Sequence, residues 1–365
     1  MRLHRDLPTD GRLDGGMAGG VTRAADRGSG SRFIAEGTDL GASSMEILDL
    51  RHFGATMLRP VLDSEAELWK KRLHWDYRAS AQLLMQYLDN HMLPGYAAFE
   101  AEHVAGYVFC VYEESKAVIG DVFATDAKPH GPALTHSIEE KLLRHILELL
   151  INSPHIDRIE SQLLLHPSGT HAATFREAGC RIYRRLFLVQ PIGAVWKQPE
   201  LSLPEGLELR PWHEHDLAPA SRLIAEAYRG HPDGLINDQY RSAQGSMRFL
   251  NNIVRYSGCG TFSPQVSHVI VEQGSRELVA LVLGSRVSHE SGHITQICVH
   301  PGFRRKGLAR TLLSVVSYWF MRQGATEISL TVTEANQEAI ELYVAEGYTF
   351  SHSFDAAVWE RSQQR

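Results

Sequence analysis

The chain has 365 residues, 43% of them hydrophobic, with a formal net charge of −6 and four cysteines. This length and apolar content suffice for two domains with buried cores, and no apolar run approaches the roughly 18 residues that a membrane-spanning helix needs. The cysteines lie far apart without a C-x-x-C pair, which excludes a disulfide framework or a thiolate metal site and suits a reducing compartment. The acidic balance argues against nucleic-acid binding, and the N-terminus lacks the apolar stretch of a secretory signal. We therefore expect a cytoplasmic protein that binds neither nucleic acids nor membranes.

The first 44 residues are rich in glycine, aspartate and arginine and have little apolar periodicity. Such a segment buries too little apolar surface to fold, so we expect a disordered leader over 1–44. Met45 opens the first strand-like run, MEILDLRHF, and is a candidate for the biological start.

Two series of predicted elements follow in the same order. The first has three β-rich runs within Tyr96–Ala124, a helix over Ala133–Leu150, a strand over Arg158–Leu165 and a helix over Gly169–Gly179. The second begins with a strand (Leu207–Trp212), a helix (Leu217–Tyr228) and three β-rich runs within 268–299. It continues with a helix over Lys306–Met321, a strand over Glu327–Thr333, a helix over Asn336–Gly347 and strands near 348–353 and 356–359.

The shared order predicts a tandem repeat of one fold of about 150 residues. Phe175–Gly179 mirrors Tyr343–Gly347, and each segment ends a helix with a glycine cap. The proline-containing stretch between the two series is the predicted linker. The predicted boundaries are a leader at 1–44, a first domain at 45–192, a linker at 193–206 and a second domain at 207–365.

One motif in the second half resembles a zinc-protease signature. His289–His293 reads H-E-x-x-H, which binds zinc where a helix places both histidines on one face. Here Gly292 interrupts the string and β-patterned runs flank it, so we expect a hairpin turn. No third ligand follows at a suitable spacing, and we predict no metal.

A second motif, R-x-x-G-x-A at Arg304–Ala309, follows a predicted strand and opens an amphipathic helix. Unpaired backbone N–H groups and the helix dipole at such a place favour an anion such as pyrophosphate. Gly307 allows the backbone to approach the phosphate closely, and the basic residues before it add positive charge. A solvated basic helix start is the alternative that this motif alone leaves open.

The wider pattern decides between these two interpretations. Val299–Ala309 reads VHPGFRRKGLA, and Asn336–Tyr348 reads N-x-x-A-x-x-L-Y-x-x-x-G-Y. Together the motifs resemble the acetyl-CoA-dependent N-acetyltransferase superfamily known as GNAT, over 207–359. The resemblance implies an α/β fold in which helices flank a mixed, mostly antiparallel sheet. Because the first half resembles this fold in outline, the chain looks like a tandem GNAT protein with a degenerate N-terminal copy.

The resemblance implies acetyl-CoA as cosubstrate and assigns the residues that would bind it. Main-chain amides of the loop would hold the pyrophosphate, at Arg304, Arg305, Lys306, Gly307, Leu308 and Ala309. The preceding strand end would pair with the pantetheine arm, at Ile297, Cys298 and Val299, and a backbone N–H there would stabilise the oxyanion. Asn336 would contact the cofactor arm, and an ordinary N-cap is its alternative role.

Tyr343 matches the family tyrosine that protonates the leaving thiolate of coenzyme A. A tyrosine can do so because its pKa, about 10, lies above that of a thiol, about 8.5. A core aromatic residue on the inner face of this helix is the alternative interpretation.

His293 is the predicted general base, because it occupies the position of the glutamate that histone-type family members use. Strand alternation predicts that it shares a face with Thr295, Ile297 and Val299, and an imidazole with a pKa of about 6.5 suits the task. Glu290 or Glu334 acting through a water remains an alternative base, and a solvated turn histidine is the alternative role of His293.

The first domain departs from the family pattern where catalysis would need it. Alignment of the two halves places Pro129 and Pro132, which have no N–H, in the phosphate loop, and Phe175 at the position of the acid. We therefore expect residues 45–192 not to bind acetyl-CoA productively and to serve as a scaffold and one wall of the substrate cleft.

The expected activity is transfer of an acetyl group from acetyl-CoA to a primary amine, by direct attack in a ternary complex. The acceptor is a small-molecule amine or a protein or peptide amine. A non-catalytic acyl-CoA-binding or sensing protein, or an acyltransferase that uses another acyl-CoA, is the alternative. Loops such as Tyr228–Tyr256 would select the acceptor, and neither they nor the rest of the sequence indicate its identity or the oligomeric state.

Overall fold

The computed structural model describes residues 45–362, except 101, 126–131, 194–201 and 256–259. The predicted leader, most of the predicted linker and Pro129 therefore lie outside the described residues. Within the described part, no helix has the length and apolar character to cross a membrane.

The N-terminal half contains six strands and four α-helices in its described residues. They are β1 (Glu46–Asp49), α1 (Ala55–Leu73), α2 (Arg78–Asp89), β2 (Gly95–Glu100), β3 (His103–Glu113), β4 (Lys116–Ala124), α3 (Pro132–Asn152), β5 (Arg158–Gln162), α4 (Ala172–Glu177) and β6 (Arg181–Pro191). The short 3-10 helix η1 (Leu50–His52) follows β1.

The C-terminal half repeats the order with an additional helical segment after its first helix. Its elements are β7 (Leu207–Pro211), α5 (Leu217–Ala227), α6 (Asp233–Ile236), α7 (Ala243–Arg255), β8 (Thr261–Phe262), β9 (His268–Glu272), β10 (Leu278–Arg286), β11 (Ser291–Val299), α8 (Leu308–Arg322), β12 (Glu327–Thr333), α9 (Gln337–Ala345) and β13 (Thr349–Glu360). Three 3-10 helices are η2 (Glu214–Asp216), η3 (Asp238–Arg241) and η4 (Pro301–Phe303).

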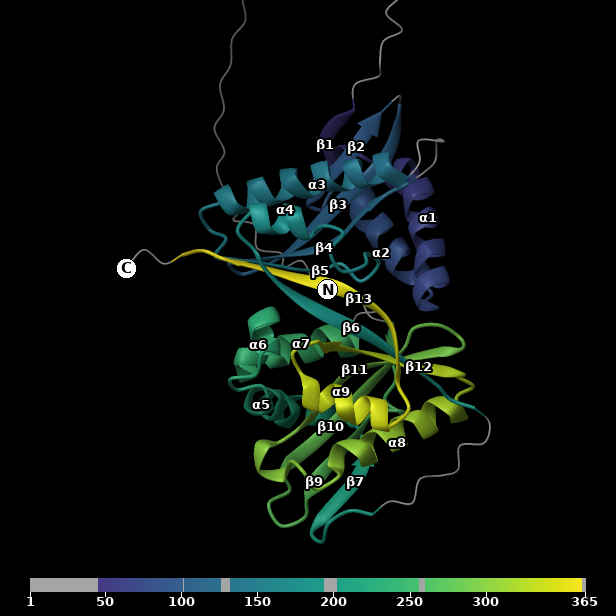
Figure 1. The fold of residues 1–365 in the computed structure, drawn as a ribbon, viewed down its shortest axis with the longest axis vertical. Coiled ribbons are helices and arrows are strands. Elements are labelled where there is room, and N and C mark those ends of the chain that lie inside the picture. The colour runs from purple at the N-terminus through teal and green to yellow at the C-terminus, as the bar shows by residue number, and fades with distance from the viewer. Residues whose placement is uncertain (1–44, 101, 126–131, 194–201, 256–259, 363–365) are drawn as a thin grey trace, which may run out of the picture.

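The strands form one 13-stranded sheet that runs through both halves (Figure 1). Its order is β1-β2-β3-β4-β5-β13-β6-β12-β11-β10-β9-β7, and β8 pairs with β10 beside this path. The pairs β4–β5 and β11–β12 are parallel, and the other neighbours along this path are antiparallel. This confirms the predicted mixed, mostly antiparallel sheet flanked by helices.

The last strand of each half crosses into the other half. β13 lies between β5 and β6, and β6 lies between β13 and β12. Figure 1 shows these two long strands at the junction of the two halves. Because each strand completes its neighbour's hydrogen-bonded ladder, neither half leaves an open strand edge at the junction. β6, which belongs to the predicted first domain by sequence, thus completes the sheet of the second half.

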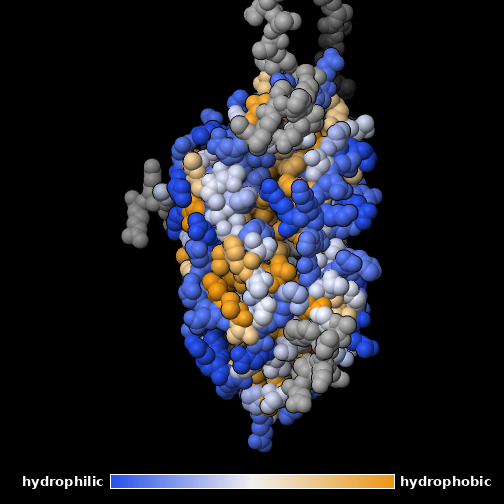
Figure 2. Space-filling view, turned by 45° about the vertical axis from the view of Figure 1, so that its right-hand side comes forward, coloured by the Kyte–Doolittle hydropathy of each residue, from blue (hydrophilic) through white to orange (hydrophobic). Residues whose placement is uncertain are grey.

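Helices cover both faces of each half of the sheet. In α3 the buried residues Leu142, Ile146 and Leu150 recur every four positions, so one face of the helix packs on the sheet. α1 and α2 pack on the opposite face in a separate core cluster. In the C-terminal half, α8 covers one face and α5 with α7 the other. The face drawn in Figure 2 has apolar patches among hydrophilic residues.

Most elements predicted from hydrophobic periodicity are present, and the departures are at the C-terminal strands, at α1 and α2, and at β6, α6 and α7, which were not predicted. The two predicted terminal strands are one strand, β13, because a register shift between Phe350 and His352 interrupts the pattern without ending the pairing. α1 and α2 were not predicted, and α1 has Pro60 within it. His289 and Glu290 lie in the turn between β10 and β11 and His293 lies in β11, which confirms the hairpin predicted in place of a zinc helix.

Candidate functional site

β11 and β12 run parallel and then separate partway along. Their pairing covers 291–294 of β11 and 327–330 of β12. Beyond this point β12 continues beside β6, and β11 continues beside β10. Among the described strands, none pairs with the freed edge of β11. Ile297, Cys298 and Val299, which were predicted to contact the pantetheine arm, lie at this opening.

Arg305 and Gly307 shape the loop between β11 and α8. Their φ angles are 61° and 80°, in the left-handed region that is easily reached only by glycine. Gly307 is the N-cap of α8, and the N–H of Thr311 donates to its carbonyl at 3.0 Å. Within the described residues, the N–H groups of 305–309 donate to no acceptor. They lie at the positive end of a 15-residue helix, so they can bind a pyrophosphate.

The side chains of this loop hold its shape and leave the backbone exposed. Arg304 Nη2 donates to the Ala227 carbonyl at 2.7 Å, which ties the loop to the end of α5. Arg305 forms an exposed ion pair with Glu338 at 2.5 Å, and Lys306 Nζ lies 4.8 Å from the centre of the Phe303 ring. Leu308 is buried and Ala309 is half-buried, so both anchor the first turn of α8.

Asn336 is the N-cap of α9. Its Oδ1 accepts from the N–H of Ala339 at 3.3 Å, and its Nδ2 lies 3.3 Å from Nε2 of His231. The side chain therefore has the capping role and also faces the loop between α5 and α6.

Tyr343 projects from α9 into the core beside α8. Its side chain packs in the same cluster as Leu308, it is 8% exposed, and its ring lies edge-on to Tyr348 with the centroids 5.8 Å apart. The hydroxyl makes no hydrogen bond to any described residue. Burial raises the pKa of Tyr343, the charge of Asp233 raises it further, and Arg185 opposes this shift. The hydroxyl is therefore protonated and has a proton to donate.

His293 does not share a face with the other residues predicted beside it. The pairing of β11 with β10 shifts by one residue at Thr295, which forms a β-bulge. Because an extra residue reverses the alternation, Ile297 and Val299 pack on the α8 side. The ring of His293 instead contacts Trp75 from the N-terminal half, with the centroids 4.9 Å apart. The predicted shared face was wrong.

The burial of His293 also lowers its ability to accept a proton. His293 is 6% exposed, and its Nδ1 lies 2.9 Å from Oγ of Ser329. Burial, and secondly the charge of Arg185, lower the pKa of His293 to about 3. The ring is then neutral, as a base must be, but it is a weak proton acceptor. Its role as general base stays a prediction.

The buried state of His293 predicts acid-sensitive stability. The folded pKa of about 3 lies below the ordinary value of 6.5, so the stability it contributes is present above pH 6.5 and is lost as the pH falls toward 3. One proton taken up on unfolding corresponds to about 1.4 kcal/mol per pH unit. We expect His293→Gln to reduce this slope in urea unfolding measured at a series of pH values.

The matched control is His145→Gln, an exposed histidine on α3, which should leave the slope nearly unchanged. Equal slopes for His293→Gln and the wild type would contradict the assignment.

The two alternative bases lie at opposite ends of the parallel pair β11–β12. Glu290 is in the turn before β11, at the end remote from Val299. Glu334 follows β12, is half exposed and lies 3.6 Å from Arg184. Both would need a water to act.

Several polar residues near Tyr343 were not predicted from the sequence. The Thr333 hydroxyl donates to the buried carboxylate of Asp233. Arg185 Nη2 donates to Thr331 Oγ1 at 3.0 Å, whereas its buried Nε has no partner in the described residues. These side chains come from β6, α6 and β12, and no local motif marks them.

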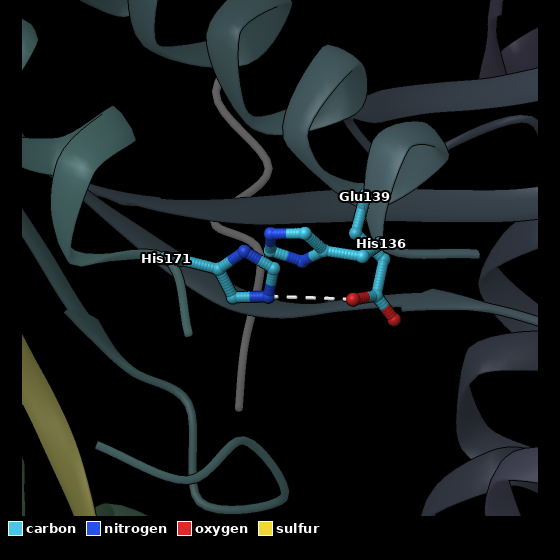
Figure 3. Close-up of side chains that lie close together, drawn as sticks. All are labelled: His136, Glu139 and His171. Atoms are coloured by element: carbon cyan, nitrogen blue, oxygen red, sulfur yellow. Dashed lines mark ion pairs between the residues drawn. The ribbon is translucent and has the colours of Figure 1, made fainter. Parts of the chain in front are cut away.

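In the N-terminal half, the counterpart positions differ as predicted from the sequence. Phe175 is 3% exposed in the core and has no hydroxyl, and Pro132 is the first residue of α3. Nearby, His136, Glu139 and His171 lie close enough together to hold a metal ion (Figure 3). A cavity of about 970 Å³ adjoins them, away from the opening between β11 and β12.

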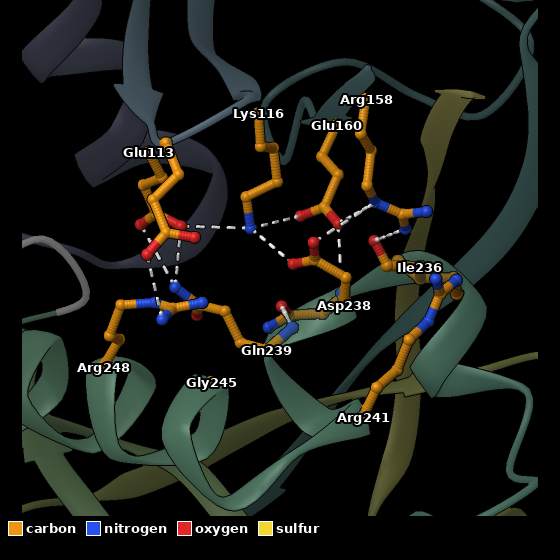
Figure 4. Close-up of polar contacts among 12 residues, drawn as sticks. Glu113, Lys116, Arg158, Glu160, Ile236, Asp238, Gln239, Arg241, Gly245 and Arg248 are labelled. Atoms are coloured by element: carbon orange, nitrogen blue, oxygen red, sulfur yellow. Dashed lines mark hydrogen bonds and ion pairs between the residues drawn. The ribbon is translucent and has the colours of Figure 1, made fainter. Parts of the chain in front are cut away.

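A group of buried and part-buried charged residues joins the N-terminal half to the segment α6–η3–α7 (Figure 4). Lys116 Nζ lies 2.7 Å from Asp238, 3.1 Å from Glu113 and 3.4 Å from Glu160. The Asp238 N–H donates to Glu160 at 3.0 Å. We call these residues, together with Arg158, the inter-half ion cluster.

Arg158 makes the densest set of contacts in this cluster. Its Nε lies 2.6 Å from Glu160, and its Nη2 donates to the carbonyls of Leu235 at 2.6 Å and Ile236 at 3.4 Å. Its Nη1 also pairs with Glu360 of β13. The cluster thus fixes the position of α6, which carries Asp233 into the site.

Comparison with known proteins agrees with this geometry. Residues 238–348 match the sequence model of the acetyltransferase (GNAT) family. The fold is similar to a GCN5-related N-acetyltransferase from Sphaerobacter thermophilus, with 17% identity, a TM-score of 0.56 and coverage of 86% of this chain and 95% of that one.

Two further solved structures share the fold over most of this chain. A tandem GNAT protein from the clavulanic acid biosynthesis pathway is 13% identical, with a TM-score of 0.53 and coverage of 88% of this chain and 100% of that one. The glucosamine N-acetyltransferase region of a fungal multi-domain β-N-acetylglucosaminidase is 13% identical, with a TM-score of 0.58. The match covers 88% of this chain and 38% of that one. Residues 238–348 therefore match the GNAT family by sequence, and most of the chain has the fold of solved GNAT proteins.

Proposed function

We propose that the C-terminal half transfers an acetyl group from acetyl-CoA to an amine. The observation that supports this most is the combination of three features around α8. The strands β11 and β12 part beside it, its N-terminal amides have no partner among the described residues, and the protonated Tyr343 belongs to the same core cluster as Leu308 in its first turn. Members of the family typically use acyl-CoA, and the loop at Arg304–Ala309 would hold the pyrophosphate.

The proposed reaction is direct acyl transfer. The amine nitrogen attacks the thioester carbonyl carbon, and a backbone N–H at 297–299 stabilises the oxyanion. When the carbon–sulfur bond breaks, the coenzyme A thiolate takes the proton of Tyr343. The amine loses a proton to a base, which the sequence-based prediction identifies as His293, with Glu290 or Glu334 acting through a water as the alternative. Residues 45–192 serve as scaffold, with the inter-half ion cluster holding one wall of the cleft.

The direct test is thiol release from acetyl-CoA in the presence of a panel of amines. The panel should include polyamines, amino acids, aminosugars and peptide N-termini. We expect steady turnover with at least one amine and no turnover in its absence. Tight binding of coenzyme A without turnover for any amine would favour the alternative, a non-catalytic acyl-CoA-binding protein.

Two glycine variants test separately whether the loop at Arg304–Ala309 binds acetyl-CoA. Gly307→Ala forces a side chain into the left-handed region, which costs about 1–2 kcal/mol and should weaken acetyl-CoA binding about fivefold to thirtyfold. Gly302→Ala, in the same loop but without positive φ, is the matched control and should bind normally. Equal affinities for both variants in calorimetry would contradict the loop assignment.

A further inference from the structure

The N-terminal half has its own parting of parallel strands. β4 and β5 pair only over 116–119 and 158–161, and β4 then continues to Ala124 before α3 begins. In the C-terminal half, the corresponding place is the proposed acetyl-CoA site. Here it adjoins the cavity of about 970 Å³. The cavity is bordered by the end of α1, the end of β4, the first turns of α3 and the loop after β5, and its lining includes His136, Glu139 and His166.

Three side chains converge beside this cavity. His136 and Glu139 are three residues apart on α3, so they lie on one face about one turn apart. His171 directly precedes α4. One potential ligand atom from each residue lies within 4.8 Å of the other two, and Figure 3 shows the three side chains directed toward one another.

A chain of hydrogen bonds determines which nitrogen of His171 is free. His166 Nε2 lies 2.9 Å from the Val122 carbonyl, which can only accept, so this nitrogen carries the proton. His166 Nδ1 therefore accepts, and the nitrogen 3.3 Å away, His171 Nε2, donates to it. This leaves a lone pair on Nδ1 of His171. That atom is buried and has no hydrogen-bond partner in the described residues, and the His171 side chain is 2% exposed.

The other two side chains are held in a similar way. Glu139 Oε1 accepts from the N–H of Ala124 at 3.2 Å, and its Oε2 lies 3.4 Å from His171 Nε2. His136 Nε2 lies 3.4 Å from the carboxylate of Glu140. His136 Nδ1 is buried and, like Nδ1 of His171, is without a partner in the described part of the chain. Buried polar atoms without a partner are uncommon and costly in a purely structural network.

We propose that His136, Glu139 and His171 bind a divalent transition metal ion of the Zn²⁺ type, with His166 orienting His171. Imidazole nitrogen and carboxylate oxygen suit such ions, and three protein ligands leave one position open. Because His136 and Glu139 line the cavity, that position can take a water or an anionic group from it. The supporting contacts of His166 and Glu140 are those that second-shell groups make to metal-binding histidines. The sequence-based expectation of no metal considered H-E-x-x-H and did not foresee this group.

The test is a Zn²⁺ titration of the full-length chain after dialysis against a chelator, in competition with a chromophoric chelator. We expect one ion per chain. His136→Gln and His171→Gln should each weaken binding at least tenfold, and His166→Gln about tenfold to a hundredfold because it acts on His171. His145→Gln, on the same helix outside the group, is the matched control and should bind like the wild type.

Melting temperature gives a second readout that does not depend on the acetyl-transfer activity. Zn²⁺ should raise the melting temperature of the wild type and of His145→Gln, because it binds only the folded chain, and should not raise that of His136→Gln. The His136 side chain is 41% exposed, so this variant decides the outcome even where His171→Gln fails to fold. A wild type without a stoichiometric Zn²⁺ site, or a His136→Gln variant that binds as tightly as the wild type, would overturn the proposal.

Discussion

Replacing Tyr343 with phenylalanine should lower kcat by about 10²–10⁴, the usual contribution of a positioned acid or base, and leave the Kd of acetyl-CoA nearly unchanged. The variant removes only the hydroxyl, which makes no hydrogen bond to the described residues, so the fold loses little. The ring, 8% exposed in the α8 core, keeps its packing. Steady-state rates and calorimetric binding of acetyl-CoA measure the two effects separately.

Tyr348→Phe is the matched control for this variant. Tyr348 is 2% exposed and its ring packs edge-on to Tyr343, so it tests the loss of a buried tyrosine hydroxyl in the same core. We expect near-normal turnover. If Tyr343→Phe also turns over normally, Tyr343 is not the acid and its role is that of a core aromatic residue.

Arg158→Met should lower the free energy of unfolding by about 3–5 kcal/mol, because removal of one partner leaves buried charges uncompensated. The Arg158 side chain is 7% exposed, and Glu160, at 8%, would lose its contact at 2.6 Å. The carbonyls of Leu235 and Ile236 would lose their donor as well. The segment that carries Asp233 would then be less fixed, so we expect a higher KM for the amine in addition to lower stability.

Arg181→Met is the control for Arg158→Met. Arg181 pairs with Glu360 at 2.5 Å, as Arg158 does through Nη1, but its side chain is 53% exposed. An exposed pair contributes about 0–1 kcal/mol, so urea unfolding should show a small loss and the amine KM should stay near the wild-type value. Similar losses in the two variants would indicate that burial of the cluster does not matter to stability.

The inter-half ion cluster and the exchanged strands both connect the N-terminal half to the proposed site. β6 completes the sheet beside β12, and the residues of β3, β4 and β5 fix η3 and α6. The N-terminal half thus supports the site from two sides, through the main chain and through buried charges. The proposed metal site would give it a ligand of its own at the place that corresponds to the proposed acetyl-CoA site of the other half.

The sequence by itself determined the local features: the loop before α8, the hairpin before β11 and the positions of most helices and strands. The loop Arg304–Ala309 and the helix after it are contiguous, so their backbone geometry depends on neighbours within a few residues, and a short motif predicts both. The hairpin at His289–Gly292 was predicted for the same reason. Hydrophobic periodicity likewise located most helices and strands, because it reports the face that an element buries.

Only the tertiary structure decided which distant residues meet. The face of His293 depends on one extra residue at Thr295, and a slip of one residue reverses every side chain beyond it. The place of β13 depends on its pairing with β5, some 200 residues earlier in the chain. His136 and His171 meet through packing between α3 and the start of α4. Such contacts arise from the whole chain's packing, since no local hydrogen bond or periodicity encodes them.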